Sequence, residues 1–217
     1  ILRPGIRDRF NRDLAAMRFG AEQAEQRSAE ARRLRFTGVV ETLARSVAME
    51  MDLRLEAAAL SEFAENTKDD ADFRVPEPDW QLTAREILID EWIDGIRLSD
   101  VEALRAAGHD LPALGRKIIQ SFLKHAIRDG FFHADMHPGN LFVDAEGRLV
   151  AVDGGIMGRL GLKERRFLAE ILLGFITRDY RRVAEVHFEA GYVPAHHDVE
   201  DCAQAIRAVG EPIHDKR

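Results

Sequence analysis

The sequence has almost no cysteine, no long apolar run and no excess of positive charge. Cys202 is the only cysteine among 217 residues, which excludes an internal disulfide and a cysteine-based metal cluster. No stretch of 18 or more apolar residues occurs, so nothing in this sequence is expected to span a membrane. The 38 acidic residues outnumber the 31 basic ones, and the net charge of −7 argues against a generally cationic nucleic-acid-binding protein.

The composition is that of a folded chain, with 46% hydrophobic and 32% charged residues. Its length suits one large domain or two small ones, at roughly 150 residues per domain. The charge is uneven, because residues 1–35 hold nine Arg and five Asp or Glu, a net charge of +4 that leaves −11 for the rest. The simplest interpretation is a solvated basic helix face. The alternative is contact with an acidic partner or an anionic lipid surface.

Two long helices are predicted in the first third of the chain. Apolar residues recur at steps of three and four from Phe10 to Ala21, which predicts a helix from Ile6 to about Leu34, and the same spacing predicts a second helix over 37–66. The later patterns predict a buried strand at 87–93, a helix from Ser99 to about Ala107, an amphipathic helix at 111–128, a hairpin of 141–143 and 149–152, and two or three helices after Gly161. Without strand–helix–strand alternation, the fold class is α+β.

The residues typical of phosphate chemistry lie in two segments. Asp135 and Asn140 are five residues apart in a loop that contains Pro138 and Gly139, and Asp153 directly follows an apolar strand. Mg2+ binds oxygen atoms of carboxylate and carboxamide side chains together with oxygen atoms of substrate phosphates. Kinase-type phosphoryl transfer uses this order of an Asp, an Asn and a second Asp after a hairpin. For either segment alone, an Asx-rich turn that bonds its own backbone is an equally good interpretation.

These segments, His133-Ala-Asp-Met-His-Pro-Gly-Asn140 and Val152-Asp-Gly-Gly-Ile-Met-Gly-Arg-Leu160, resemble the UbiB/AarF family of atypical, protein-kinase-like ATPases. Three further segments agree with the family's helix motif, its hinge and the stretch after its nucleotide-binding lysine: Glu50-Met-Asp-Leu-Arg-Leu-Glu56, Glu91-Trp-Ile-Asp-Gly95 and Ile1-Leu-Arg-Pro-Gly5. The resemblance runs from residue 1 to about residue 160.

The resemblance implies an atypical protein-kinase-like fold, with a partial N-lobe of long helices over residues 1–90 and a mostly helical C-lobe over 91–217. It also implies roles for individual residues in binding ATP and Mg2+. Asp135 would be the catalytic-loop aspartate, and Asn140 and Asp153 would hold the metal. Glu50 would pair with the nucleotide-binding lysine. The hinge residues Glu91, Trp92 and Ile93 would lie against the adenine ring.

Two departures from the family pattern bear on activity. The lysine and the phosphate loop would precede Ile1, so we expect the chain to be a fragment that is inactive as given. The family's Asp-Phe-Gly motif reads Asp153-Gly154-Gly155 here. Loss of the Phe removes an apolar plug and is expected to make this segment more mobile.

The implied function is that of a kinase-like ATPase that supports ubiquinone biosynthesis. The expected partners are a nucleotide, quinone-biosynthesis proteins and isoprenoid lipid precursors, with no nucleic acid. The full-length protein would lie at the cytoplasmic face of a membrane, and this fragment would be soluble. Two alternatives stay open: a small-molecule phosphotransferase of the aminoglycoside or choline kinase type, which shares the loop spacing, and a pseudokinase that binds nucleotide as a scaffold without turnover.

Overall fold

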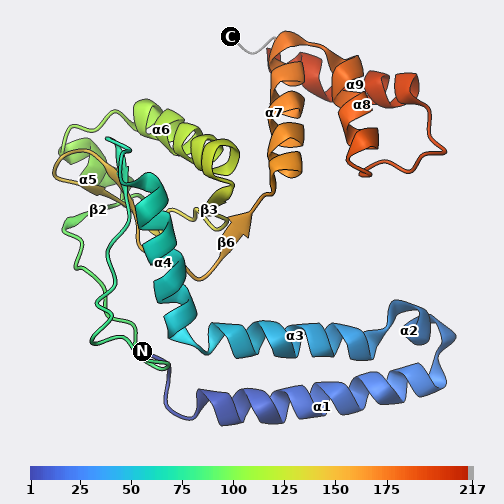
Figure 1. The fold of residues 1–217 in the computed structure, drawn as a ribbon, viewed down its shortest axis with the longest axis horizontal. Helices are drawn as coiled ribbons and strands as arrows, with labels where there is room; N and C mark the ends of the chain where they lie inside the picture. Colours follow the sequence, from blue (N-terminus) through green and yellow to red (C-terminus); the bar gives the residue numbers. More distant parts are fainter. Residues whose placement is uncertain (215–217) are drawn as a thin grey trace. The chain divides into compact units, whose positions relative to one another are not determined.

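The computed structural model describes residues 1–214 and forms two compact units. The first unit combines residues 1–109 with 135–156, and the second combines 110–134 with 157–214. The resemblance implies a different division, with a boundary between an N-lobe and a C-lobe at residue 90, and that division stays a prediction. The mixed α+β class is confirmed, with long helices in the first unit and a mostly helical second unit (Figure 1).

The first unit contains four helices before its sheet and one after β2: α1 (Ile6–Arg27), α2 (Ala29–Leu34), α3 (Phe36–Glu50), α4 (Leu53–Thr67) and α5 (Val101–Ala106). Its strands are β1 (Phe73–Arg74), β2 (Gly95–Arg97), β4 (Leu141–Asp144) and β5 (Leu149–Ala151), in the order β1-β5-β4-β2. The predicted hairpin is confirmed as the antiparallel pair β4–β5, with Leu141 opposite Ala151. Both of these residues are fully buried, so the hairpin forms the centre of this unit's core.

The predicted helix over 37–66 is wrong at its middle, where the chain turns between α3 and α4. Asp52 lies outside both helices, and its carboxylate accepts the backbone N–H of Arg54 and caps α4. The N–H of Leu53 donates to the carbonyl of Arg85, a contact that a continuous helix would not allow. The predicted helix over 6–34 is likewise interrupted at Ser28, which caps α2.

Helices α1, α2 and α3, residues 6–50, form an arm in which α1 and α3 run antiparallel side by side (Figure 1). Glu25 joins their facing ends, since its carboxylate accepts the N–H and the hydroxyl of Thr37 at 2.8 and 3.0 Å. Near the other end, the Arg7 guanidinium donates to the carbonyl of Met51. The arm is therefore tied at both ends.

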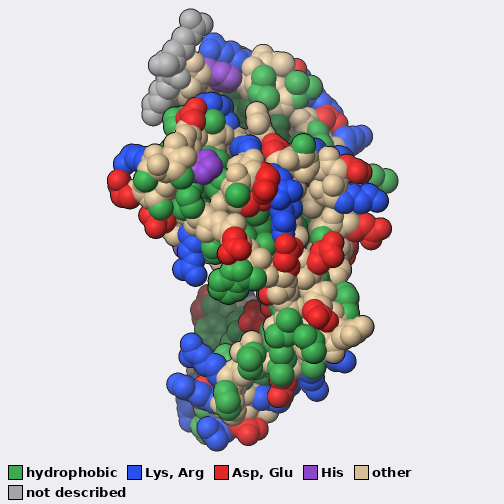
Figure 2. Space-filling model, turned by 90° about the vertical axis from the view of Figure 1, so that its left-hand side faces the viewer, with side chains coloured by type: hydrophobic (Ala, Val, Ile, Leu, Met, Phe, Trp, Pro, Cys, Tyr) green, Lys and Arg blue, Asp and Glu red, His purple; other side chains and the backbone are tan. Residues whose placement is uncertain are grey.

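The predicted buried strand at 87–93 is wrong. This segment makes only isolated bridges, Ala84 with Ile87 and Pro78 with Asp90, and the true strand is β2. The Pro78–Asp90 bridge is held by the N–H groups of Asp79 and Glu91, which donate to the carbonyls of Ile89 and Glu77, and the pairing does not extend into a ladder. Trp92 is 84% exposed. Figure 2 shows that hydrophobic side chains reach the surface among charged ones on one face of the molecule.

The second unit contains α6 (Leu111–Lys124), a π-helical turn η1 (His125–Asp129), β3 (Phe131–His133), β6 (Met157–Arg159), α7 (Leu162–Thr177), α8 (Tyr180–Glu189) and α9 (Val199–His214). The predicted helices at 111–128 and after Gly161 are confirmed. Strands β3 and β6 pair antiparallel, and the ring of Phe132 lies where Gly158 has no side chain. Within residues 1–214, no helix combines the length and the apolar character needed to cross a bilayer.

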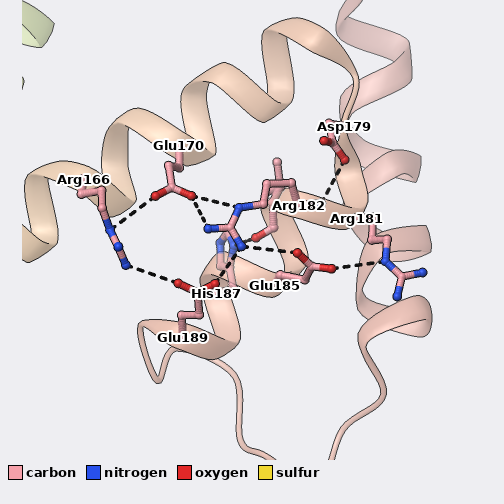
Figure 3. Close-up of polar contacts among 9 residues, drawn as sticks. Arg166, Glu170, Asp179, Arg181, Arg182, Glu185, His187 and Glu189 are labelled. Atoms are coloured by element: carbon pink, nitrogen blue, oxygen red, sulfur yellow. Dashed lines mark hydrogen bonds and ion pairs between the residues drawn. The ribbon is translucent and has the colours of Figure 1, made fainter.

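An ion-pair network connects α7 and α8 in the second unit (Figure 3). The Arg182 guanidinium bonds to Glu170 on α7 and to Glu185 and Glu189 on its own helix. These three carboxylates raise the pKa of Arg182, mainly through the hydrogen bonds that its guanidinium donates to Glu189 and Glu170. Arg166 adds bonds to two of the carboxylates, so the network fixes the packing of the two helices.

Candidate active site

The loop that carries Asp135 and Asn140 is folded by its own hydrogen bonds. The N–H of His137 donates to the carbonyl of Asp135 at 2.7 Å, and the N–H of Asn140 donates to the carbonyl of His137 at 2.8 Å. The Asn140 side-chain amide reaches back to the Asp135 carbonyl at 3.4 Å. The side chain of Asp135 is exposed and that of Asn140 is half-buried. The loop therefore brings these two predicted residues together beside the start of β4.

Asp153 comes to the same place from the other strand of the hairpin. The N–H of Val152 donates to the carbonyl of Asn140 at 3.0 Å, which extends the β4–β5 pairing by one position beyond Leu141 and Ala151. Asp153 follows directly and is half-buried. Asn140 and Asp153 thus lie at one end of a single hairpin, in the first unit. The local contacts of an Asx-rich turn are present as well, because one Asp153 carboxylate oxygen accepts the N–H of Gly155 at 2.8 Å.

Glu56, in the first turn of α4, lies against this hairpin end. Burial raises the pKa of the Glu56 carboxyl, the negative charge of Asp153 raises it further, and a hydrogen bond from the backbone N–H of Gly154 partly offsets the shift. The nearby carboxylate of Asp90 acts in the same direction as Asp153. Burial also raises the pKa of Asp90 itself. Glu56 therefore lies close enough to Asp153 and Asp90 for their negative charges to repel, and a bound cation would reduce this repulsion.

Glu56 was not among the predicted site residues, although its sequence position contained a signal. Glu56, Leu60 and Phe63 recur at helical steps, and the two apolar residues are buried against the sheet. Glu56 is on this same face. A carboxylate at such a position is rarely found without a partner or a function.

Glu50 and Asp52 lie elsewhere. Glu50 is the last residue of α3 and is exposed, and among residues 1–214 it has no hydrogen bond or ion pair with Asp153. Asp52 caps α4, and its hydrogen bonds to Arg54, helped by the charge of Arg85, lower its pKa to about 2. The structure gives Asp52 a role in holding the start of α4. The expected pairing of Glu50 with a lysine stays a prediction.

The predicted hinge residues line a cleft of about 680 Å3 in the first unit. Glu91, Trp92 and Ile93 lie along it, together with other residues from β2, α5 and the hairpin, namely Ile96, Asp100, Phe142 and Val152. Glu91 is held by an ion pair with Arg74 of β1, and the Trp92 indole N–H donates to the carboxylate of Asp94. Because Val152 lines the cleft and directly precedes Asp153, the cleft reaches the hairpin end.

The donor set fits a magnesium ion that is shared with a nucleotide. Asn140 and Asp153 offer oxygen atoms, which Mg2+ prefers. Within residues 1–214, no group of three or more His, Cys, Asp or Glu side chains is arranged to hold a metal alone. A metal bound through one carboxylate and one carboxamide therefore depends on further oxygens, such as those of phosphates.

A hairpin that presents an Asn and an Asp at one end, a preceding loop Asp and a cleft beside the hinge are the parts of a protein-kinase-like fold. Comparison with known proteins narrows this class. The sequence model of the ABC1 atypical kinase-like domain matches residues 1–187, and the chain belongs to this family. The predicted UbiB/AarF membership is thereby confirmed.

Two relatives span the whole chain. One is a protein described as probable protein kinase UbiB, from Marinobacter nauticus, which is 39% identical over 220 residues. The match covers the whole of this chain and 40% of the length of that relative. A solved structure, the complex of Rv3197 with erythromycin from Mycobacterium tuberculosis, is similar with a TM-score of 0.72 and 26% identity, covering 99% of this chain and 54% of that one.

Proposed function

We propose that this chain carries the metal- and adenine-binding part of a kinase-like protein that uses Mg2+ and ATP. One observation carries the proposal. A single hairpin end presents Asn140 and Asp153, and the cleft lined by the hinge residues reaches that end through Val152. Membership of the ABC1 family supports this function over a phosphotransferase for aminoglycosides or choline.

The proposed roles follow from position. Asn140 and Asp153 hold Mg2+, and Asp135 orients the attacking hydroxyl or water from its exposed place in the loop. Bound Mg2+ would supply positive charge next to the phosphoryl group being transferred. Glu91, Trp92 and Ile93 bind the adenine ring along the cleft. Glu56 fixes the backbone at Gly154 and so orients Asp153.

The biological setting is proposed from family membership alone. We infer that the whole protein supports ubiquinone biosynthesis at the cytoplasmic face of a membrane, with quinone-biosynthesis proteins and isoprenoid lipid precursors as partners. Since this chain spans 40% of its curated relative, these inferences concern the whole protein.

The test is to measure nucleotide binding and ATP hydrolysis for the parent and three variants, Asp135→Asn, Asp153→Asn and Asp69→Asn. Asp69 is an exposed carboxylate of the same unit and serves as the control. Asp153→Asn should weaken Mg2+-dependent ATP binding by about tenfold or more, and the control should match the parent. Asp135→Asn should abolish hydrolysis and leave the affinity unchanged.

Hydrolysis is measured in the longest protein that contains the chain, and binding in the chain itself. If Asp153→Asn binds Mg2+-ATP as tightly as the parent, the metal site is not where we propose. If ATP binds but Asp135→Asn hydrolyses it as the parent does, the catalytic role of Asp135 is refuted. If ATP binds and no protein form hydrolyses it, the chain acts as a nucleotide-binding scaffold.

A further inference from the structure

The arm formed by residues 6–50 has an apolar groove between its two long helices. Its lining is entirely non-polar, with Met17, Gly20, Ala21 and Ala24 from α1 and Phe36, Val39, Val40 and Leu43 from α3. The groove encloses about 470 Å3. Helix α3 has no buried residue along its length, and α1 has one, Ala21. The two helices therefore pack on each other without covering this face.

The shape of the groove suits a helix. Three of the four residues on its α1 side are small, namely Gly20, Ala21 and Ala24, and a side-chain carbon added to Gly20 would meet no atom within 4 Å. The lining extends over eight residues of each helix, which is about two turns or 12 Å. Small residues let the backbone of a third helix approach closely. A groove between two helices can bind such a third helix through a few of its apolar side chains. A flat bilayer surface would not fill a concave groove.

One end of the groove is positively charged. Arg27, Arg32 and Arg35 lie around α2, between the two segments that line the groove. Arg32 donates to the backbone carbonyls of Glu25 and Gln26. No carboxylate of residues 1–214 forms an ion pair with Arg27, Arg32 or Arg35. Arg33, in contrast, is paired with Glu30. Three guanidinium groups without an ion pair therefore stand at this end, where the carboxylate of Glu25 is bonded to Thr37.

We propose that the groove binds an amphipathic helix of a partner protein, one with two turns of apolar residues and carboxylates just beyond them. The apolar residues would fill the groove, and the carboxylates would pair with Arg27, Arg32 and Arg35. A second copy of this chain is a poor occupant, because its own arm begins with nine Arg and five acidic residues in residues 1–35 and would bring like charge to this end. The proposal does not depend on the nucleotide site.

The probe is a synthetic amphipathic peptide of about 18 residues, with Leu at helical steps and Glu beyond the apolar stripe. Two companions are a twin with Lys for every Glu and a scrambled peptide of the same composition. Anisotropy titrations with the whole chain should give an affinity for the acidic peptide about tenfold or more above that for either companion. Raising NaCl from about 50 to 300 mM should weaken this binding.

Groove variants locate the site. Leu43→Glu and Val39→Glu alter lining residues that are 42% and 61% exposed, so both should keep the fold, as checked by circular dichroism. Each should reduce peptide affinity about tenfold or more. The control Phe19→Glu alters an exposed residue of the same arm outside the groove and should bind as the parent does. Arg27→Glu should weaken binding of the acidic peptide, whereas Arg12→Glu, nearer the start of α1, should not.

Several results would overturn the proposal. Equal binding of the acidic peptide and its Lys twin would remove the charge argument, and unchanged binding by both groove variants would remove the site. Dimerisation of the parent that Leu43→Glu abolishes would make a second copy the occupant. Binding to vesicles with about 30% phosphatidylglycerol that Leu43→Glu abolishes, without peptide binding, would make an anionic membrane the occupant.

Discussion

Leu60 occupies the space that a side chain at residue 154 would need. A Cβ atom built on Gly154 would lie 2.7 Å from the Cγ atom of Leu60 and 3.3 Å from the carbonyl oxygen of Glu56. Leu60 is 1% exposed and cannot swing aside. Leu60 of α4 therefore supplies an apolar side chain next to the segment in which Gly154 stands in place of the family's Phe. Helix α4 and the segment that carries Asp153 pack directly against each other.

This contact predicts that Gly154→Ala lowers the free energy of unfolding. Overpacking of a core typically costs about 1–3 kcal/mol. Leu60→Ala should also destabilise, by about 2–5 kcal/mol, because it leaves a cavity. The double variant should lose less than the sum of the two single losses, since the smaller residue at 60 makes room for the new methyl group. Urea unfolding of all four proteins measures the coupling.

The control for this cycle is Gly20→Ala in α1, where an added Cβ meets nothing within 4 Å. A helix-interior glycine replaced by alanine should raise stability, by about 0.5–1 kcal/mol. Strictly additive losses in the double variant would show that Leu60 and Gly154 do not compete for the same space.

The raised pKa of Glu56 predicts a pH dependence of stability. A carboxyl group whose pKa is higher in the folded state binds its proton more tightly there. The resulting stabilisation is complete at low pH and is lost as the pH rises from the ordinary value of 4.5 through the folded value. Glu56→Gln should flatten this decline when unfolding is measured between about pH 4 and 8.

Glu65→Gln, at an exposed position of the same helix, is the control and should follow the parent at each pH. Parallel pH profiles for the parent and Glu56→Gln would mean that Glu56 is not held against the Asp153 charge.

The Asp52 carboxylate predicts a different pH dependence at the start of α4. Its pKa of about 2 lies below the ordinary 3.8, so its stabilising effect is present above that value and is lost as the pH falls toward 2. Asp52→Asn keeps a capping side chain and removes the charge, whereas Asp52→Ala removes both. At neutral pH, the melting temperature of the parent should be higher than that of Asp52→Asn, which in turn should be higher than that of Asp52→Ala. Equal melting temperatures for the two variants would show that the side chain at residue 52 does not cap α4.

The network around Arg182 predicts a salt-sensitive contribution to the second unit. Arg182→Met should lower the melting temperature, because three carboxylates lose a shared cation. The difference from the parent should shrink in about 0.5 M NaCl, where charges are screened. Arg116→Met, on the exposed side of α6, is the matched control and should change little. A loss that is the same at low and high salt would indicate packing instead of charge.

Trp92 predicts an optical signal for nucleotide binding. It lines the cleft and is 84% exposed, so an adenine ring stacked nearby should change its fluorescence. Trp80→Phe leaves Trp92 as the single tryptophan and should keep the signal, whereas Trp92→Phe should lose it. A Mg2+-ATP titration that leaves the single-tryptophan protein unchanged, while binding is seen by calorimetry, would move the nucleotide away from Trp92.

The sequence predicted best those elements whose contacts are local. The β4–β5 hairpin joins strands that are close in sequence, so its pairing and the proximity of Asn140 to Asp153 followed from spacing alone. The break between α3 and α4 was missed because the apolar pattern continues across Met51, which is buried by tertiary packing. The apolar run at 87–93 predicts a buried strand, yet Trp92 within it is exposed.

The position of Glu56 beside Asp153 could not be predicted from spacing, because the two are 97 positions apart in the sequence. It depends on how α4 packs against the hairpin, through Leu60 and Gly154. The sequence places Glu50, Asp52 and Glu56 in one short motif. The cap at Asp52 puts Glu50 and Glu56 on different helices.

The hydrogen bond from the N–H of Val152 to the carbonyl of Asn140 fixes the backbone next to both proposed metal ligands. Because both ligands are fastened to the same pair of strands, their separation is set by backbone pairing and not by the docking of any helix. Shifting α4 would tilt Asp153 and leave the spacing intact. Damage to the pairing itself would be the only local way to pull the two apart.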